Sequence, residues 1–119
     1  MKGVLILAHG SRVDSTKQTI ETVVSMVREK IPEMPLQIAY MEFCECDIRG
    51  GIAKLVEQGV TEIKAVPYFL FEGIHIQEDI PGEIGEILKD YPGVTLTMGR
   101  TLGADPRLAE ILADRIREN

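Results

Sequence analysis

The chain has 119 residues, a formal net charge of −6 and no cluster among its 13 lysines and arginines. This length gives room for one domain with a single hydrophobic core. The acidic charge argues against a protein that binds the phosphates of nucleic acid or an anionic membrane surface. No apolar run approaches the ~20 residues that a membrane span needs. We therefore expect a single domain, residues 1–119, with no nucleic acid and no membrane among its partners.

Four strand-like runs alternate with four helix-like runs along the chain. The predicted strands are Gly3–Ala8, Leu36–Glu42, Glu62–Pro67 and Val94–Met98. This alternation indicates βαβ units and an α/β fold with a parallel sheet. Right-handed crossovers with the first strand in the centre predict the strand order 2-1-3-4, with a topological switch between strands one and three.

The helix-like runs carry apolar residues at helical spacing. In the first, Ser15 and Gln18 fit a capping box at the start, and Pro32 ends the helix. The second is closed by Gly59, and the third accepts Pro81 in its first turn, where proline is tolerated. The fourth runs from about Asp105 to the end of the sequence. The four apolar stripes are Ile20, Val23, Val24, Val27 and Ile31; Ile48, Ile52, Leu55 and Val56; Ile80, Ile84, Ile87 and Leu88; and Leu108, Ile111, Leu112 and Ile116.

The two histidines of the chain, His9 and His75, follow the first and third predicted strands. Open α/β sheets bind ligands at the carboxyl ends of their strands, beside the topological switch. Imidazole is both a base near neutral pH and a metal ligand. The two histidines are therefore expected in one crevice, although solvated loop histidines would also fit this pattern.

Residues around His9 could bind an anionic group. Gly10 permits a sharp turn, Ser11 precedes a helix whose amino end attracts anions, and Arg12 offers a fork for a carboxylate. The alternative is a strand-to-helix turn with no ligand. Glu42, at the end of the second predicted strand, could pair with a metal or an imidazolium, or be a solvated carboxylate.

The segment after the third strand could wall a pocket. Phe69, Leu70 and Phe71 would suit a flat hydrophobic ligand, or they could belong to the core. Gly73 frees the backbone before His75. Asp79, with Glu78, could orient an imidazole, but capping of the third helix is the favoured role for Asp79.

The two cysteines, Cys44 and Cys46, are too close in sequence to staple a fold. Such a pair is expected to be reduced, and the start of the chain is too short for a signal-peptide core, so a cytoplasmic protein is predicted. The thiols could hold a soft metal, but a partly buried thiol is the favoured role. Glycine-rich phosphate loops are absent, so ATP and dinucleotides are not indicated.

Three segments together resemble a known family: Leu5–Arg12, Pro67–His75 and Asp79–Pro81. They are similar to the short form of the sirohydrochlorin cobaltochelatase family, class II chelatases of cobalamin biosynthesis, and the resemblance covers the whole chain. It implies a flavodoxin-like chelatase half-domain that acts as a homodimer, with helices on both faces of its sheet. Relatives commonly continue with Glu-Pro-Ser after the second strand, whereas this chain has Glu45-Cys46-Asp47, so the turn there departs from the pattern.

The resemblance also implies the reaction, which is insertion of a divalent metal, Co²⁺ first, into the tetrapyrrole sirohydrochlorin without ATP. The metal is then a substrate, and no tightly bound cofactor is expected. His9 and His75 would bind the metal and accept protons, and Glu42 would be the acidic residue that the family has near the end of strand two. The candidate substrate-binding residues are Gly10, Ser11, Arg12, Phe69, Leu70, Phe71, Gly73, Ile74 and Arg100.

Three other functions remain open at this point. Relatives insert nickel for coenzyme F430 or iron for sirohaem. A carrier of metal or tetrapyrrole would use the same histidines without turnover. A histidine phosphatase also starts with a strand and His-Gly, but its motif is Arg-His-Gly, and here Ala8 precedes His9.

Overall fold

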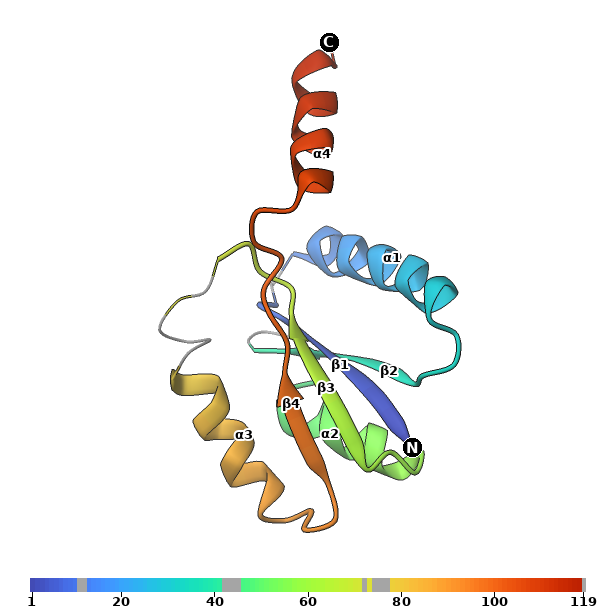
Figure 1. Cartoon of the computed structure of the whole chain (residues 1–119), viewed down its shortest axis with the longest axis vertical. Helices are drawn as coiled ribbons and strands as arrows, with labels where there is room; N and C mark the ends of the chain where they lie inside the picture. The colour runs from blue at the N-terminus through green and yellow to red at the C-terminus, as the bar shows by residue number, and fades with distance from the viewer. Residues whose placement is uncertain (11–12, 42–45, 72, 74–77, 119) are drawn as a thin grey trace.

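The computed structural model describes residues 1–10, 13–41, 46–71, 73 and 78–118 and contains four strands and four helices within them. In chain order they are β1 (Lys2–Ala8), α1 (Asp14–Lys30), β2 (Leu36–Tyr40), α2 (Ile48–Glu57), β3 (Glu62–Pro67), α3 (Ile80–Leu88), β4 (Thr95–Met98) and α4 (Pro106–Arg117). The strands form one parallel sheet in the order β2-β1-β3-β4 (Figure 1). The predicted fold class and strand order are confirmed.

Strand β1 is the centre of the sheet. It pairs with β2 from Val4 opposite Leu36 and with β3 from Lys2 opposite Glu62. Six consecutive residues of β1, Gly3 to Ala8, are buried. A strand that is covered on both faces needs such a continuous apolar run.

Helices cover both faces of the sheet. On one face, α2 and α3 pack their isoleucines and Leu55 against Leu5 and Leu7. On the other, α1 places Val24 against Val4, Ile6 and Ile38. Helix α2 approaches the sheet closely at Gly51, where a Cβ atom would lie 2.7 Å from Cδ1 of Leu5 and 3.1 Å from Cβ of Ala39. Glycine is therefore needed at this contact.

Two predicted helix caps are wrong. Helix α1 begins at Asp14, after Val13 in extended conformation (φ −92°, ψ 118°), so Ser15 lies inside the first turn and cannot be the cap of a capping box. Before α3, Asp79 already has helical backbone angles (φ −71°, ψ −45°), whereas an N-cap residue needs extended ones. Pro81 does lie in the first turn of α3, as predicted.

Strand ends also differ slightly from the prediction. Strand β2 ends at Tyr40, whose N–H donates a hydrogen bond to the carbonyl of Cys46 at 2.7 Å. One further bond, from the Met41 N–H to the carbonyl of Ala8 at 2.9 Å, continues the pairing with β1. Glu42 lies outside the described residues. Strand β4 begins at Thr95, one residue later than predicted.

Helix α4 extends away from the rest of the domain (Figure 1). Asp105 caps it, since its carboxylate accepts a hydrogen bond from the N–H of Arg107, and Pro106 occupies its first turn. None of residues 106–117 is buried. Among the described residues, no helix combines the length and the apolar composition that a membrane span needs.

Candidate functional site

The candidate site lies at the carboxyl edge of the sheet, where β1 and β3 end side by side. The carbonyl of Leu7 accepts a hydrogen bond from the N–H of Tyr68 at 2.8 Å, one residue beyond the end of β3. Leu7 lies opposite Pro67, so two residues further along the two segments His9 lies opposite Phe69. The sheet itself therefore brings these two side chains together.

The rings of His9 and Phe69 are in contact. Their centroids are 5.1 Å apart and their planes are inclined by 58°, a tilted arrangement that aromatic pairs favour. Phe69 is half-buried against the core on the α2–α3 face, whereas His9 is exposed. One side of the imidazole is thus supported by a fixed ring while the histidine stays open to solvent and to a ligand.

The chain turns sharply after His9. Gly10 has φ of +88°, in the region that favours glycine because a Cβ atom would collide with the backbone there. The predicted turn at Gly10 is confirmed. Its expected anion-binding residues, Ser11 and Arg12, lie outside the described residues.

A third segment, after β4, joins the same edge. The N–H of Gly99 donates to the carbonyl of Ala65 at 2.7 Å, that of Leu102 to Phe69 at 2.8 Å, and that of Gly103 to Leu70 at 3.1 Å. The hydrogen bonding between β3 and β4 thus continues into the residues that follow each of these strands. This continuation fixes residues 99–103 beside Phe69 and Leu70.

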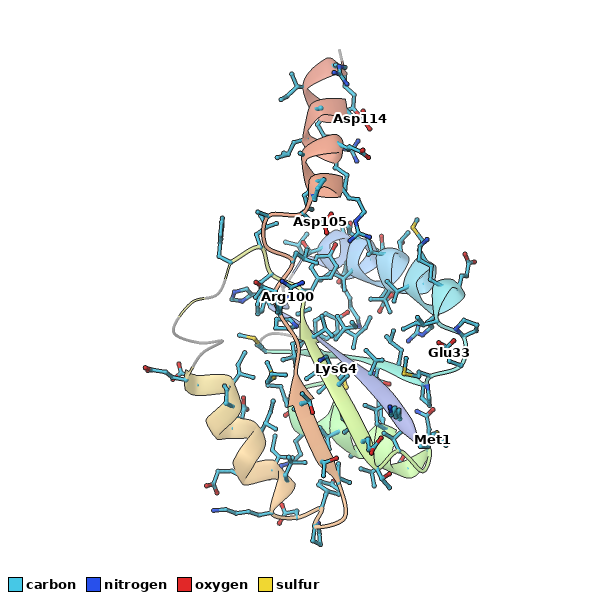
Figure 2. The ribbon with its side chains drawn as sticks, viewed as in Figure 1. Met1, Glu33, Lys64, Arg100, Asp105 and Asp114 are labelled. Carbon is cyan, nitrogen blue, oxygen red and sulfur yellow. The ribbon has the colours of Figure 1, made fainter. Side chains whose placement is uncertain are left out.

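Arg100 lies in this segment, exposed, at the end of the sheet from which α4 departs and opposite Met1 (Figure 2). A hollow of about 570 Å³ lies beside it, lined by Leu70, Phe71, Arg100, Thr101, Leu102, Gly103, Ala104, Asp105 and Pro106. Of the predicted substrate-binding residues, the structure brings Leu70, Phe71 and Arg100 together. Leu102, Gly103 and Ala104 were not predicted as site residues. They line the hollow because backbone hydrogen bonds hold Leu102 and Gly103 beside Phe69 and Leu70.

Several predicted site residues cannot be placed. His75, Glu42 and Ile74 lie outside the described residues, and Gly73 is exposed between two such gaps. Among the residues that are described, no three His, Cys, Asp or Glu side chains gather into a possible metal site. The described part of the site therefore consists of one histidine, aromatic and aliphatic walls, and one arginine.

The described cysteine lies elsewhere. Cys46 is half-buried before α2, and its Sγ lies 3.8 Å from Nε2 of Gln37, in the first half of β2. This position matches the partly buried thiol favoured from the sequence. Cys44 lies outside the described residues, so a role for the pair in metal binding stays untested.

Comparison with known proteins assigns the domain to a family. The CbiX family model matches residues 3–119. A sirohydrochlorin cobaltochelatase of Methanopyrus kandleri is 33% identical, over 99% of this chain and 96% of that protein. A sirohydrochlorin ferrochelatase of Priestia megaterium is 35% identical, over 99% of this chain but only 44% of its own length.

A solved structure agrees in three dimensions. The sirohydrochlorin chelatase SirB from Bacillus subtilis subspecies spizizenii, crystallised in complex with cobalt, superposes with a TM-score of 0.90 at 28% identity. The match covers 98% of this chain and 50% of that one. The parallel sheet with a histidine at its switch point thus defines a chelatase-type α/β domain. The chain belongs to the CbiX family.

Proposed function

We propose that the protein is a sirohydrochlorin chelatase that inserts a divalent metal, Co²⁺ as the first candidate, into sirohydrochlorin without ATP. Family membership and the full-length likeness to the cobaltochelatase of Methanopyrus kandleri support the reaction. The observation that carries the proposal is the exposed imidazole of His9 at the carboxyl edge of β1, held against Phe69. Imidazole is the side chain that suits both halves of the reaction.

The reaction exchanges two pyrrole N–H protons for one divalent metal ion. A base with a pKa near neutrality can accept such a proton and later release it to solvent. An unprotonated imidazole can also hold the incoming metal, and sparse protein ligation leaves positions for the pyrrole nitrogens. His9 supplies one imidazole, and His75 is proposed to supply the second. Glu42 is proposed as an acidic partner that stabilises the protonated form.

The walls of the hollow suit the rest of the substrate. Leu70 and Phe71 offer an apolar surface to one face of a flat macrocycle, and Phe69 supports the histidine next to it. The guanidinium of Arg100 can bind a peripheral carboxylate of the tetrapyrrole. Gly10, Ser11 and Arg12 are proposed to bind further carboxylates at the amino end of α1. Such remote contacts can contribute the binding energy that bends the macrocycle toward the metal.

The metal is a substrate in this proposal, and no tightly bound cofactor is included. Cobalt is favoured because relatives that match over almost their whole length, among them that of Methanopyrus kandleri, are named cobaltochelatases. The ferrochelatase of Priestia megaterium supports iron as the alternative. Nickel remains the third candidate, since imidazole binds all three ions and cells select among them by availability.

The test is an absorbance assay with purified protein, sirohydrochlorin in excess, and cobalt, nickel or ferrous iron. The expected result is many turnovers per protein with at least one metal, after the spontaneous rate has been subtracted. A rate equal to the spontaneous one with all three metals would overturn the catalytic proposal. A single stoichiometric transfer without turnover would instead identify a carrier.

We further propose a homodimer in which the carboxyl edges of two sheets face each other across the substrate. Strands lie about 4.8 Å apart, so a four-stranded sheet is narrow relative to a macrocycle with carboxylate arms. Two relatives whose chains are about twice as long contain the domain as half of their length, which supports a two-domain working unit. The proposed compartment is the cytoplasm, supported by a cysteine pair too close to staple the fold.

A further inference from the structure

Strand β2 forms one edge of the sheet, with β1 as its neighbour on the inner side (Figure 1). Residues of α1, β2 and α2 line a hollow of about 410 Å³ beside it, among them Gln37, Ile38 and Tyr40 of the strand. An edge strand that can be reached in this way can accept a strand of another molecule, because its outward N–H and C=O groups form a template.

The residues of β2 would favour such strand addition. The strand reads Leu-Gln-Ile-Ala-Tyr, with no charged residue and no proline. Short uncharged segments rich in large apolar side chains pair readily with identical segments of other molecules. The outer edge of β2 therefore needs a feature that keeps its backbone groups unavailable.

The outward backbone groups of β2 can be identified from its pairing with β1. The N–H of Met41, directly after the strand, donates to the carbonyl of Ala8 at 2.9 Å. Backbone groups of a strand point alternately to its two sides, so the odd-numbered residues from 37 to 41 face β1. The residues whose backbone groups point outward are Leu36, Ile38 and Tyr40.

Two side chains occupy outward carbonyl groups. The guanidinium Nη2 of Arg28, on α1, donates to the carbonyl of Leu36 at 3.1 Å. The side-chain Nε2 of Gln37 donates to the carbonyl of Ile38 at 3.0 Å. Both bonds lie in partly buried surroundings, where they compete less with water than exposed hydrogen bonds do.

The third outward residue is bonded within the backbone. The N–H of Tyr40 donates to the carbonyl of Cys46 at 2.7 Å. An added antiparallel strand would exchange two hydrogen bonds with each outward residue, one through its N–H and one through its C=O. Because one of the two groups is already bonded in each case, none of the three residues offers a complete pair.

Charge around the hollow acts in the same direction. Its walls carry Lys17, Arg28 and Lys54 and one acidic residue, Glu21. Two copies joined through their β2 edges would bring these cations toward each other, and like charges that meet across an interface are unfavourable. Natural sheets commonly carry charged side chains, lysine above all, at edges that stay unpaired.

We propose that Arg28 and Gln37 protect the edge of β2: their side-chain donors occupy its outward carbonyls and so prevent a second copy of this chain from adding its own β2 there. Neither residue lines the hollow beside Arg100. This role is therefore separate from the proposed metal insertion and does not depend on it.

The test is sedimentation velocity of full-length protein over a dilution series. Arg28→Met/Gln37→Met removes both donors and keeps side chains of similar length. A typical hydrogen bond changes an equilibrium constant by about fivefold, so two freed carbonyls should strengthen association beyond the native assembly by about twentyfold. Each single variant should strengthen it by about fivefold, which keeps the test valid if the double variant does not fold.

The matched control is Gln18→Met/Lys30→Met. It makes the same change in charge and adds the same side chains at two exposed positions of α1. It should associate no more than the native chain does. Thermal unfolding of all variants identifies those that are folded.

Two further measurements identify the edge. In Arg28→Met/Gln37→Lys a charged donor returns beside Ile38, so association should be about fivefold weaker than in the double methionine variant. Hydrogen exchange of the double methionine variant should show the outward amides of Leu36 and Ile38 protected at high concentration and exposed after dilution.

Four outcomes would overturn the inference. Association of the folded methionine variants at the native level would show that the two donors are not needed. Equal association of the control would reduce the effect to general stickiness of methionine. Association that the lysine variant does not weaken, or that leaves Leu36 and Ile38 unprotected, would identify another surface. Concentration-dependent protection of these amides in the native chain would show that its edge is not protected.

Discussion

His9 and Phe69, sixty residues apart in sequence, hold their rings 5.1 Å apart at the edge of the sheet. The contact follows from the pairing of β1 with β3, which ends both strands at the same level. Phe69 in turn is anchored by the hydrogen bond that its carbonyl accepts from Leu102. The imidazole is therefore positioned by the backbone pairing of three segments.

His9→Ala should lower turnover by at least about a hundredfold, the usual loss when a positioned acid–base group is removed. The domain should remain folded, because His9 is exposed beyond the end of β1. His75→Ala is expected to have a similar effect and Glu42→Gln a smaller one. Initial rates and melting temperatures of the three variants check this. Native turnover in either histidine variant would remove that histidine from the mechanism.

Phe69→Ala should reduce both stability and turnover. The ring is half-buried against the core, so its loss should cost about 2 kcal/mol of the free energy of unfolding. Without the ring the imidazole of His9 also loses its support, so kcat should fall more than it does in Phe69→Leu. Denaturant unfolding and steady-state kinetics provide the two readouts. Equal kcat values for the alanine and leucine variants would show that packing of His9 does not matter.

Arg100→Gln should raise KM for sirohydrochlorin by about tenfold or more while changing kcat less, because an arginine–carboxylate contact is lost in the ground state and transition state alike. Lys89→Gln is the control. It makes the same charge change just after α3, where Lys89 forms an exposed ion pair with Glu86. If the two variants have the same KM, only general charge attraction is involved and Arg100 makes no direct contact.

Gly51→Ala and Gly85→Ala should have opposite effects on stability. At Gly51 a Cβ atom would meet Leu5 at 2.7 Å, so α2 must move off the sheet. At Gly85 nothing lies within 4 Å of the added atom, and alanine is favoured over glycine in a helix by about 0.5–1 kcal/mol. Thermal unfolding should therefore give a lower melting temperature for the first variant and a higher one for the second.

The start of α4 should weaken in acid. The guanidinium and backbone N–H of Arg107 hydrogen-bond the carboxylate of Asp105 and hold the pKa of that carboxyl well below its ordinary value of 3.8. Because the folded pKa is the lower one, this contribution is complete above pH 3.8 and is lost as the pH falls through the folded pKa.

Circular dichroism between pH 5 and about pH 1 should detect this loss of helix in the native chain. Asp105→Asn should show a smaller acid-dependent change, because it has no carboxyl to titrate. All the other carboxylates are the same in both proteins, so the difference between the two curves isolates Asp105. Coinciding curves would contradict the prediction.

The strand order and the position of His9 could be predicted because both depend on local patterns. Alternating apolar strands and helices, with right-handed crossovers, leave few arrangements for four βα units. The turn at Gly10 follows from the same logic, since a strand must reverse sharply into its helix there.

Features that depend on backbone geometry or on distant contacts were missed. Ser15 and Asp79 have the right side chains for caps, but the backbone becomes helical at a different residue in each case. The segment from Gly99 to Gly103 looks like a loop in the sequence, yet it continues the pairing with β3 because carbonyls of Phe69 and Leu70 point toward it. The stripe of α4 was recognised, but periodicity cannot tell whether a stripe faces its own sheet or solvent.

The central place of β1 also determines the order of events during synthesis. Both neighbours of β1 in the sheet, β2 and β3, follow it in sequence. Because Lys2 pairs with Glu62, about 60 residues later, β1 has partners on both sides only after β3 has been made. At typical elongation rates of about 5–20 residues per second, that wait lasts several seconds. During this time the most apolar strand of the domain has open edges, which are sites of aggregation. The amino-terminal segment is therefore where a nascent chain most needs the protection of a chaperone.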